Sequence, residues 1–228
     1  MIRRNIALIP AAGVGARFGA GKPKQYVEIN GKTVLQHTIE IFEQHPRIDL
    51  IAVILSPEDS VFQTALSEKV RVFRVGGASR AETVRNGVSV LLEQGLAEAQ
   101  DNILVHDAAR CCLPAEALTR LLDEAEESNE GGILAIPVAD TLKRADGSHH
   151  IDETVARAGL WQAQTPQLFQ TALLNRALSV DDLSEITDEA SAVEKLGIRP
   201  RLVQGDTRNL KLTLPQDEYI VILLLKAV

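Results

Sequence analysis

Short apolar segments alternate with amphipathic segments along most of the chain. Strands buried on both faces read as continuous apolar runs, whereas helices that cover a sheet repeat their apolar positions every three or four residues. The alternation predicts an α/β protein with a mostly parallel sheet and helices on both faces. Apolar runs predict buried strands at residues 6–9, 50–55, 70–75, 103–105 and 133–138.

The predicted helices begin at recognisable capping signals. Ser56-Pro57-Glu58-Asp59 offers an N-cap followed by a proline and two acids, Ser79–Glu82 is a capping box, and Thr187-Asp188-Glu189 opens another helix. Two further helices are predicted over 114–127 and 215–228. Ligands of such folds bind at the carboxyl ends of the strands, so the residues that follow each predicted strand are the first candidates for a site.

Residues 139–160 interrupt the alternation. This segment is polar, has little apolar material to bury, and contains Asp146-Gly147, which is a hairpin-turn signal. A surface loop is the simpler interpretation, but a structureless loop of this length is uncommon in a compact domain. We therefore predict one domain spanning residues 1–228, from which 139–160 protrudes as an extended β-hairpin arm that packs on another subunit.

The composition limits the possible functions. Of 228 residues, 45% are hydrophobic and 24% charged, which is typical of a soluble globular protein. The net charge of −7 argues against a broad nucleic-acid surface, and no apolar run approaches the ~18 residues of a membrane span. The apolar run near the N-terminus is short, so we interpret it as a strand and expect a cytoplasmic protein. Cys111 and Cys112 are adjacent, which fits neither a disulfide framework nor a CxxC metal site.

A stretch rich in glycine and basic residues, 10–26, follows the first predicted strand. It is not a Walker A loop, because Lys22 is followed by Pro23 and no serine or threonine is available for Mg²⁺. It is not a dinucleotide fingerprint either, because Phe18 occupies the place of the third glycine. The glycines still let backbone N–H groups approach an anion, and Arg17 and Lys24 add positive charge. A phosphate site is favoured over a mobile turn with solvated basic residues.

Several motifs together resemble the 2-C-methyl-D-erythritol 4-phosphate cytidylyltransferase family, over nearly the whole chain. The resemblance implies the Rossmann-like sheet of nucleotide-diphospho-sugar transferases. The matching segments are Pro10–Arg17, Lys22–Tyr26, Gly76–Val84, His106–Arg110, Asp140–Lys143, Arg157–Trp161, Gln164–Gln167, Thr187–Ser191 and Asn209–Lys211.

The resemblance implies that CMP is transferred from CTP to 2-C-methyl-D-erythritol 4-phosphate, with release of pyrophosphate. Mg²⁺ is expected to be held mainly by the CTP phosphates, with no metal ligands from the protein. His106 is interpreted as structural. Thr83 keeps the hydroxyl of a serine common in the family, whereas Ala78 replaces an acid. The residues expected to bind CTP are Pro10, Ala11, Ala12, Gly13, Gly15, Gly77, Thr83, Asp107 and Ala108.

The same resemblance assigns the catalytic cations and the second substrate's site. Arg17 and Lys24 would stabilise the transition state at the α-phosphate, and Arg157 and Lys211 would hold the phosphate of the sugar alcohol. A homodimer is implied, in which Thr141 and Arg157 on the arm complete the neighbouring subunit's site. Without the resemblance, Arg157 reads as a solvated surface cation. The other residues expected at the second substrate are Arg110, Thr165 and Thr187.

Three alternative functions remain at this stage. A cytidylyltransferase for a pentitol phosphate, such as ribitol 5-phosphate, would share the fold and much of the CTP site. A dinucleotide-dependent oxidoreductase lacks support, because Leu55-Ser56 stands where an acid would hold the ribose. A sensing module that binds CTP without catalysis would have no need of Arg17, Lys24 and Lys211 together.

Overall fold

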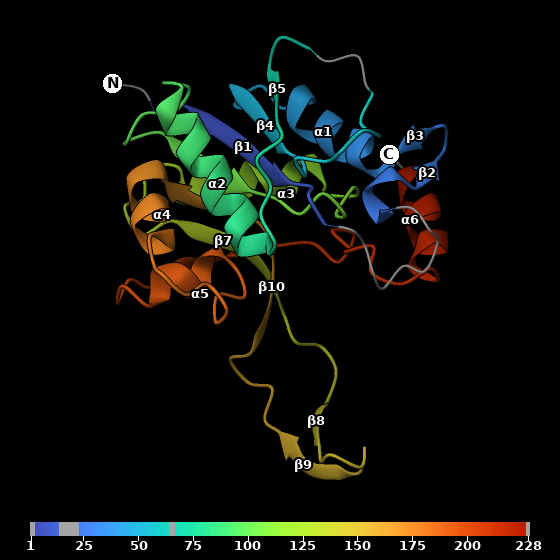
Figure 1. The fold of residues 1–228 in the computed structure, drawn as a ribbon. Helices are drawn as coiled ribbons and strands as arrows, with labels where there is room; N and C mark the ends of the chain where they lie inside the picture. The colour runs from blue at the N-terminus through green and yellow to red at the C-terminus, as the bar shows by residue number, and fades with distance from the viewer. Residues whose placement is uncertain (1–2, 14–22, 64–66, 227–228) are drawn as a thin grey trace.

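The computed structural model describes residues 3–13, 23–63 and 67–226 (Figure 1). Its centre is a seven-stranded sheet of order β11-β7-β10-β6-β1-β4-β5. Within the described chain, β10 runs antiparallel to its neighbours β6 and β7, and the other neighbouring pairs are parallel. The predicted mostly parallel sheet is therefore confirmed. Its strands are β1 (Asn5–Pro10), β4 (Leu50–Ile54), β5 (Val70–Phe73), β6 (Asn102–Val105), β7 (Gly132–Pro137), β10 (Trp161–Gln170) and β11 (Arg201–Gln204).

Helices cover both faces of the sheet. Along β1, Ala7 and Ile9 pack into one core cluster and Ile6 and Leu8 into the other, because successive side chains of a strand point to opposite faces. The first cluster is closed by α1 (Val34–Gln44) and α3 (Ala115–Ala125). The second is closed by α2 (Arg80–Glu93), α4 (Thr171–Leu178) and α5 (Glu189–Glu194) (Figure 1).

A smaller third cluster lies at one end of the molecule. Val221 of α6 (Asp217–Lys226) is buried together with Ile29 of a short hairpin, β2 (Glu28–Ile29) and β3 (Lys32–Thr33). The turn of this hairpin is Asn30-Gly31, with φ angles of 51° and 81°. A 3₁₀ helix, η1 (Lys24–Tyr26), precedes the hairpin. Among the described residues, no helix is long and apolar enough to cross a membrane.

The five predicted strands and most of the predicted helix starts are confirmed. Ser79 caps α2 by accepting the Glu82 N–H at 3.1 Å, and Asp188 caps α5 by accepting the Ser191 N–H at 2.8 Å. Gly95 ends α2 with a φ of 65°. The capping signals therefore indicated the right positions, because each one satisfies a backbone N–H that the first turn leaves unpaired.

The helix predicted after Ser56 is wrong. Residues 56–63 form a turn and irregular chain. The Asp59 carboxylate accepts the hydroxyl of Tyr26 at 2.5 Å and the N–H groups of Val61 and Phe62 at 3.1 and 3.0 Å. The acid that was interpreted as part of a first helical turn instead ties this loop to η1.

The predicted hairpin arm is present and projects away from the sheet (Figure 1). It consists of β8 (Leu142–Ala145) and β9 (Ile151–Val155), which pair antiparallel. Its base continues the β7–β10 ladder, since the Val138 N–H donates to the Leu160 carbonyl at 3.0 Å. At the tip, the Asp146 carboxylate accepts the N–H groups of Ser148 and His150 at 2.8 and 3.0 Å.

Candidate active site

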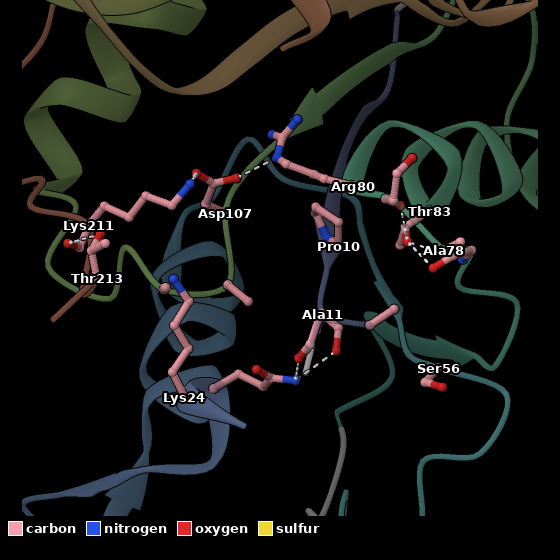
Figure 2. Close-up of a pocket in the computed structure, with 17 residues that line it drawn as sticks. Pro10, Ala11, Lys24, Ser56, Ala78, Arg80, Thr83, Asp107, Lys211 and Thr213 are labelled. Carbon is pink, nitrogen blue, oxygen red and sulfur yellow. Dashed lines mark hydrogen bonds and ion pairs between the residues drawn. The ribbon is translucent and has the colours of Figure 1, made fainter. Parts of the chain in front are cut away.

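A cavity of about 690 Å³ opens at the carboxyl ends of β1, β4 and β6 (Figure 2). This is the edge at which parallel α/β sheets bind ligands. The cavity brings together segments that are far apart in the sequence: the loop after β1, η1, the start of α2, the end of β6 and the chain before α6. Its lining residues are Pro10, Ala11, Ala12, Gly13, Lys24, Gln25, Ser56, Gly77, Ala78, Ser79, Arg80, Thr83, Asp107, Ala108, Ala109, Lys211 and Thr213.

The loop after β1 is held in place by a buried glutamine. The Gln25 amide donates to the carbonyls of Ala11 and Gly13, both at 3.0 Å. Lys24 lines the cavity beside it, and its ammonium donates to the Leu212 carbonyl at 3.0 Å. Gln25 therefore fixes the backbone of this loop next to the Lys24 cation. The predicted site residues Gly15 and Arg17 lie outside the described residues.

Gly76 lets the loop before α2 approach the loop after β1 closely. A Cβ on Gly76 would lie 2.3 Å from the Ala12 Cβ and 2.8 Å from the Leu55 carbonyl oxygen, which leaves no room for a side chain. The Gly77 N–H donates to the Thr83 hydroxyl at 3.1 Å, and that hydroxyl donates to the Ser79 carbonyl at 2.9 Å. The threonine hydroxyl therefore shapes the loop that forms one wall of the cavity.

Asp107 stands at the centre of a charged cluster (Figure 2). One oxygen of its carboxylate accepts from Arg80 Nε at 2.8 Å, and the other lies 2.7 Å from Lys211 Nζ and 3.7 Å from Arg110 Nε. Although burial alone would raise the pKa of Asp107, the cations of Arg80 and Lys211 hold the pKa of this carboxyl well below its usual range. Asp107 is therefore an anion that fixes cations in place and not a proton donor.

Arg80 connects this cluster to a second buried acid. Its guanidinium donates to both carboxylate oxygens of Glu189, at 2.6 and 3.1 Å. Glu189 is 1% exposed, and burial raises the pKa of its carboxyl while the Arg80 cation opposes that shift. The pair joins the first turn of α2 to the first turn of α5.

A neutral histidine lies behind Asp107. His106 is fully buried, and its Nε2 lies 3.0 Å from the Arg110 carbonyl, which can only accept. Nε2 therefore carries the proton, and Nδ1 accepts from the Thr165 hydroxyl at 3.1 Å. The same hydroxyl accepts the Asp107 N–H at 3.1 Å. Burial lowers the pKa of His106 to about 4, which agrees with its interpretation as structural.

The buried neutral His106 predicts an acid-sensitive fold. Its pKa is about 4 in the folded protein and 6.5 in the unfolded chain, so the unfolded chain binds the extra proton between these values. The free energy of unfolding should therefore decrease as the pH falls from 6.5 to 4, by about 3 kcal/mol for this group. Urea unfolding of the native protein and of His106→Gln across this range measures it. The amide of the variant can still donate to Arg110, and its pH profile should be flatter; equal slopes would contradict the assignment.

The structure brings most of the predicted nucleotide-binding residues together but leaves the arm residues apart. Thr141 and Arg157 are exposed on the arm, and Thr187 is exposed beside the start of α5. Arg110 is largely buried beside Asp107, and Thr165 is 4% exposed. Their contacts with a second substrate remain predictions. The predicted residues that line the cavity are Pro10, Ala11, Ala12, Gly13, Lys24, Gly77, Thr83, Asp107, Ala108 and Lys211.

Among the residues that sequence reasoning missed are Gln25, Arg80 and Glu189. Gln25 received no role of its own between Lys24 and Tyr26, although a polar residue that follows a glycine-rich stretch can anchor it. Arg80 was interpreted only as part of a capping box, and Glu189 only as a first-turn acid. A basic residue directly after a Gly-Gly loop was the available signal for Arg80. For its pairing with Glu189 there was none, since 109 residues separate the two.

Lys24 and Lys211 line a cavity at this edge of the sheet and suit an anionic nucleotide, as the site of an α/β nucleotidyltransferase requires. More particularly, the chain belongs to the 2-C-methyl-D-erythritol 4-phosphate cytidylyltransferase (IspD) family, whose model matches residues 5–226. An enzyme of that name from Neisseria meningitidis serogroup A is 70% identical over 231 residues, covering all of both chains. One from Chromobacterium violaceum is 51% identical over 215 residues, or 93% of each chain.

Solved structures agree with this assignment. A crystal structure of 4-diphosphocytidyl-2C-methyl-D-erythritol synthase is 63% identical, with a TM-score of 0.89 over 99% of this chain and 100% of the other. The 2-C-methyl-D-erythritol 4-phosphate cytidylyltransferase of Thermus thermophilus is 28% identical, with a TM-score of 0.79 over 99% and 100% of the two chains. The predicted fold and family are therefore confirmed.

Proposed function

We propose that the cavity binds CTP and that its cations promote transfer of CMP to 2-C-methyl-D-erythritol 4-phosphate. The products are 4-diphosphocytidyl-2-C-methyl-D-erythritol and pyrophosphate, an intermediate and a by-product of the non-mevalonate isoprenoid pathway. The observation that carries this proposal is the Asp107 cluster, which points Lys211 into the same cavity that Lys24 lines. We expect the reaction to take place in the cytoplasm, where CTP is supplied.

The triphosphate is placed on the loop after β1. Residues 11–13 line the cavity beside Lys24. The Ala11 N–H already donates to the Ile54 carbonyl at 2.8 Å, so the amides proposed to bind the phosphates are those of Ala12 and Gly13. Gly15 and Arg17 follow in the sequence. The cytosine would meet the backbone at Gly77, where Thr83 fixes the loop. The ribose would lie next to Asp107 and Ala108, at the end of β6.

The second substrate supplies the nucleophile. A phosphate monoester has its second pKa near ~6, so at neutral pH it is mostly a dianion. No histidine or cysteine lines the described part of the cavity, although Ser56, Ser79, Thr83 and Thr213 do. Because the acceptor dianion can itself act as the nucleophile, the proposed reaction needs no covalent enzyme intermediate. The barrier lies in bringing two anions together, and positioned cations reduce it.

The sugar-alcohol phosphate is placed on the other side of the cavity. Lys211 and Arg110 flank Asp107 there, and Thr187 lies at the start of α5. Thr165 holds the Asp107 backbone through its hydroxyl, so any contact it makes with substrate would use the remaining lone pair. Arg157 and Thr141 would reach this site from a partner's arm.

Mg²⁺ would be held mainly by the triphosphate. Asp107 is the carboxylate in the described lining, and it is already paired with three cations, so it suits a contact to a metal-bound water better than direct ligation. Bound in this way, Mg²⁺ would neutralise charge on the phosphates and on the leaving pyrophosphate.

We propose that the protein is a homodimer whose arm, residues 139–160, completes the partner's site. The arm buries little of itself, and Ile151 is 67% exposed at its tip. A mixture of Lys24→Ala and Arg157→Ala proteins tests this. Half of the randomly formed dimers would be mixed and would each keep one intact site, so about a quarter of native activity should return. No recovery in a verified mixed dimer would contradict a shared site.

Pyrophosphate release tests the proposed reaction. The protein, CTP and Mg²⁺ are combined with 2-C-methyl-D-erythritol 4-phosphate in one sample and with ribitol 5-phosphate in another. Release with the first substrate alone is expected. Release with ribitol 5-phosphate alone would overturn the acceptor while keeping the CTP site. Binding of CTP without release from either would indicate a sensing module instead of an enzyme.

A further inference from the structure

Arg80 lies between Asp107 on one side and Thr83 and Ala78 on the other (Figure 2). It is the first residue of α2 and directly follows the Gly76–Ser79 loop, which is the proposed wall of the base pocket. Its side chain is 29% exposed, and all three guanidinium nitrogens are bonded to carboxylates. A planar guanidinium fixes the direction of each bond it makes, which a flexible ammonium does not.

The first carboxylate is that of Asp107. Arg80 binds one of its oxygens at 2.8 Å, and this leaves the other oxygen to Lys211 at 2.7 Å. Asp107 is thus oriented on one side by Arg80 and in turn orients Lys211, whose side chain is 40% exposed. The position of the Lys211 ammonium therefore depends on Arg80, although the two side chains bind different oxygens of Asp107.

The second carboxylate is that of Glu189, two residues after Thr187. Among the described residues, Arg80 is the cation that lies within ion-pair distance of Glu189. Helix α5 is also held by Gln167, which donates to Asp188 at 2.9 Å and accepts the Ala190 N–H at 2.8 Å. Gln167 ties α5 to the sheet, whereas Arg80 ties it to the nucleotide loop.

We propose that Arg80 is a positioning residue that couples the nucleotide pocket to the site of the second substrate. When CTP binds and fixes the loop before α2, it also fixes the Arg80 guanidinium. Arg80 then holds Lys211 in position through Asp107, and Thr187 through Glu189. CTP binding should therefore lower the KM for the sugar-alcohol phosphate. This inference rests on the proposed function, because it assigns Lys211 and Thr187 to the second substrate.

The test separates positioning from folding. Arg80→Met alone would leave Glu189 buried without its cation, which is strongly destabilising. The double variant Arg80→Met/Glu189→Gln removes both charges, and Asp107 keeps Lys211 and Arg110. Arg80→Lys retains a cation for Glu189 but cannot bridge both carboxylates with a planar fork. Arg85→Met serves as control, because it removes an arginine from the same helix whose ion pair with Glu82 is long, at 3.7 Å, and outside the cavity.

Steady-state kinetics with both substrates varied, together with thermal unfolding, give the outcome. We expect the double variant and Arg80→Lys to remain folded, to lose about 100-fold in kcat/KM for the sugar-alcohol phosphate, and to lose the dependence of its KM on CTP. Arg85→Met should behave like the native protein. Folded variants that keep kcat/KM within a few-fold of native, or that keep the CTP dependence, would overturn the proposal. A native protein that releases no pyrophosphate would overturn the proposed function instead.

Discussion

Replacing Lys24 with alanine is expected to lower kcat by about 100- to 1000-fold, which is the usual loss when one fixed stabilising group is removed from a transition state. Lys24 lines the cavity beside the loop after β1. We propose that the α-phosphate of CTP binds there. Charge on the phosphoryl oxygens grows during transfer, so the loss should appear mainly in kcat and less in the affinity for CTP.

The fold should survive this change. Gln25 keeps its two bonds to the loop after β1, and Tyr26 keeps its bond to Asp59. Lys32→Ala is a matched control, because Lys32 lies on the neighbouring hairpin in an exposed ion pair with Glu40 at 2.7 Å. Surface pairs of this kind contribute little to stability. Steady-state kinetics measures the turnover of both variants, and circular dichroism checks that both are folded. Near-native turnover by Lys24→Ala would refute the catalytic role of Lys24.

Replacing Lys211 with methionine is expected to have the second large effect on activity. We expect kcat/KM for the sugar-alcohol phosphate to fall by about 100-fold or more, because a positioned cation is lost next to an anionic substrate. Asp107 retains Arg80 at 2.8 Å and Arg110 at 3.7 Å, so its buried charge stays compensated. CTP affinity, measured by calorimetry, should change much less than the KM for the second substrate.

The control for this change lies three residues away. Arg208 pairs with Asp206 at 2.8 Å on the same segment, is 53% exposed and does not line the cavity. Arg208→Met should keep native kinetics. Equal losses in Arg208→Met and Lys211→Met would attribute the effect to the segment as a whole and not to the Lys211 charge.

The strands were predictable where burial decides the sequence. Segments such as Ile51–Ile54 are fully buried on both faces of the sheet and therefore read as apolar runs. The central strand β10, residues 161–170, was missed because it is rich in glutamine and contains Pro166. A register irregularity between Ala163 and Gln167 accommodates it, and its buried polar groups bond other segments, as Gln167 does with Asp188.

Local sequence signals gave a wrong prediction where a side chain binds a residue that is distant in the sequence. Asp59 looked like a first-turn acid but is bound by the Tyr26 hydroxyl, 33 residues away in the sequence. Helix α1 was missed although Thr33 and Gln36 form a capping box at its start. Glycines and basic residues in the sequence pointed to the segment after β1, and Pro10–Gly13 and Lys24 do line the cavity. The contacts of Arg80 with Asp107 and Glu189 are tertiary, and no local pattern reveals them.

The second substrate is expected to attack CTP directly, while the protein contributes position and charge. The stereochemical course at the α-phosphorus tests this expectation most directly, using CTP made chiral by sulfur at that position and 2-C-methyl-D-erythritol 4-phosphate as acceptor. One in-line displacement inverts the configuration, so inversion is the expected result. Retention would require two displacements through a covalent enzyme intermediate and would contradict the account.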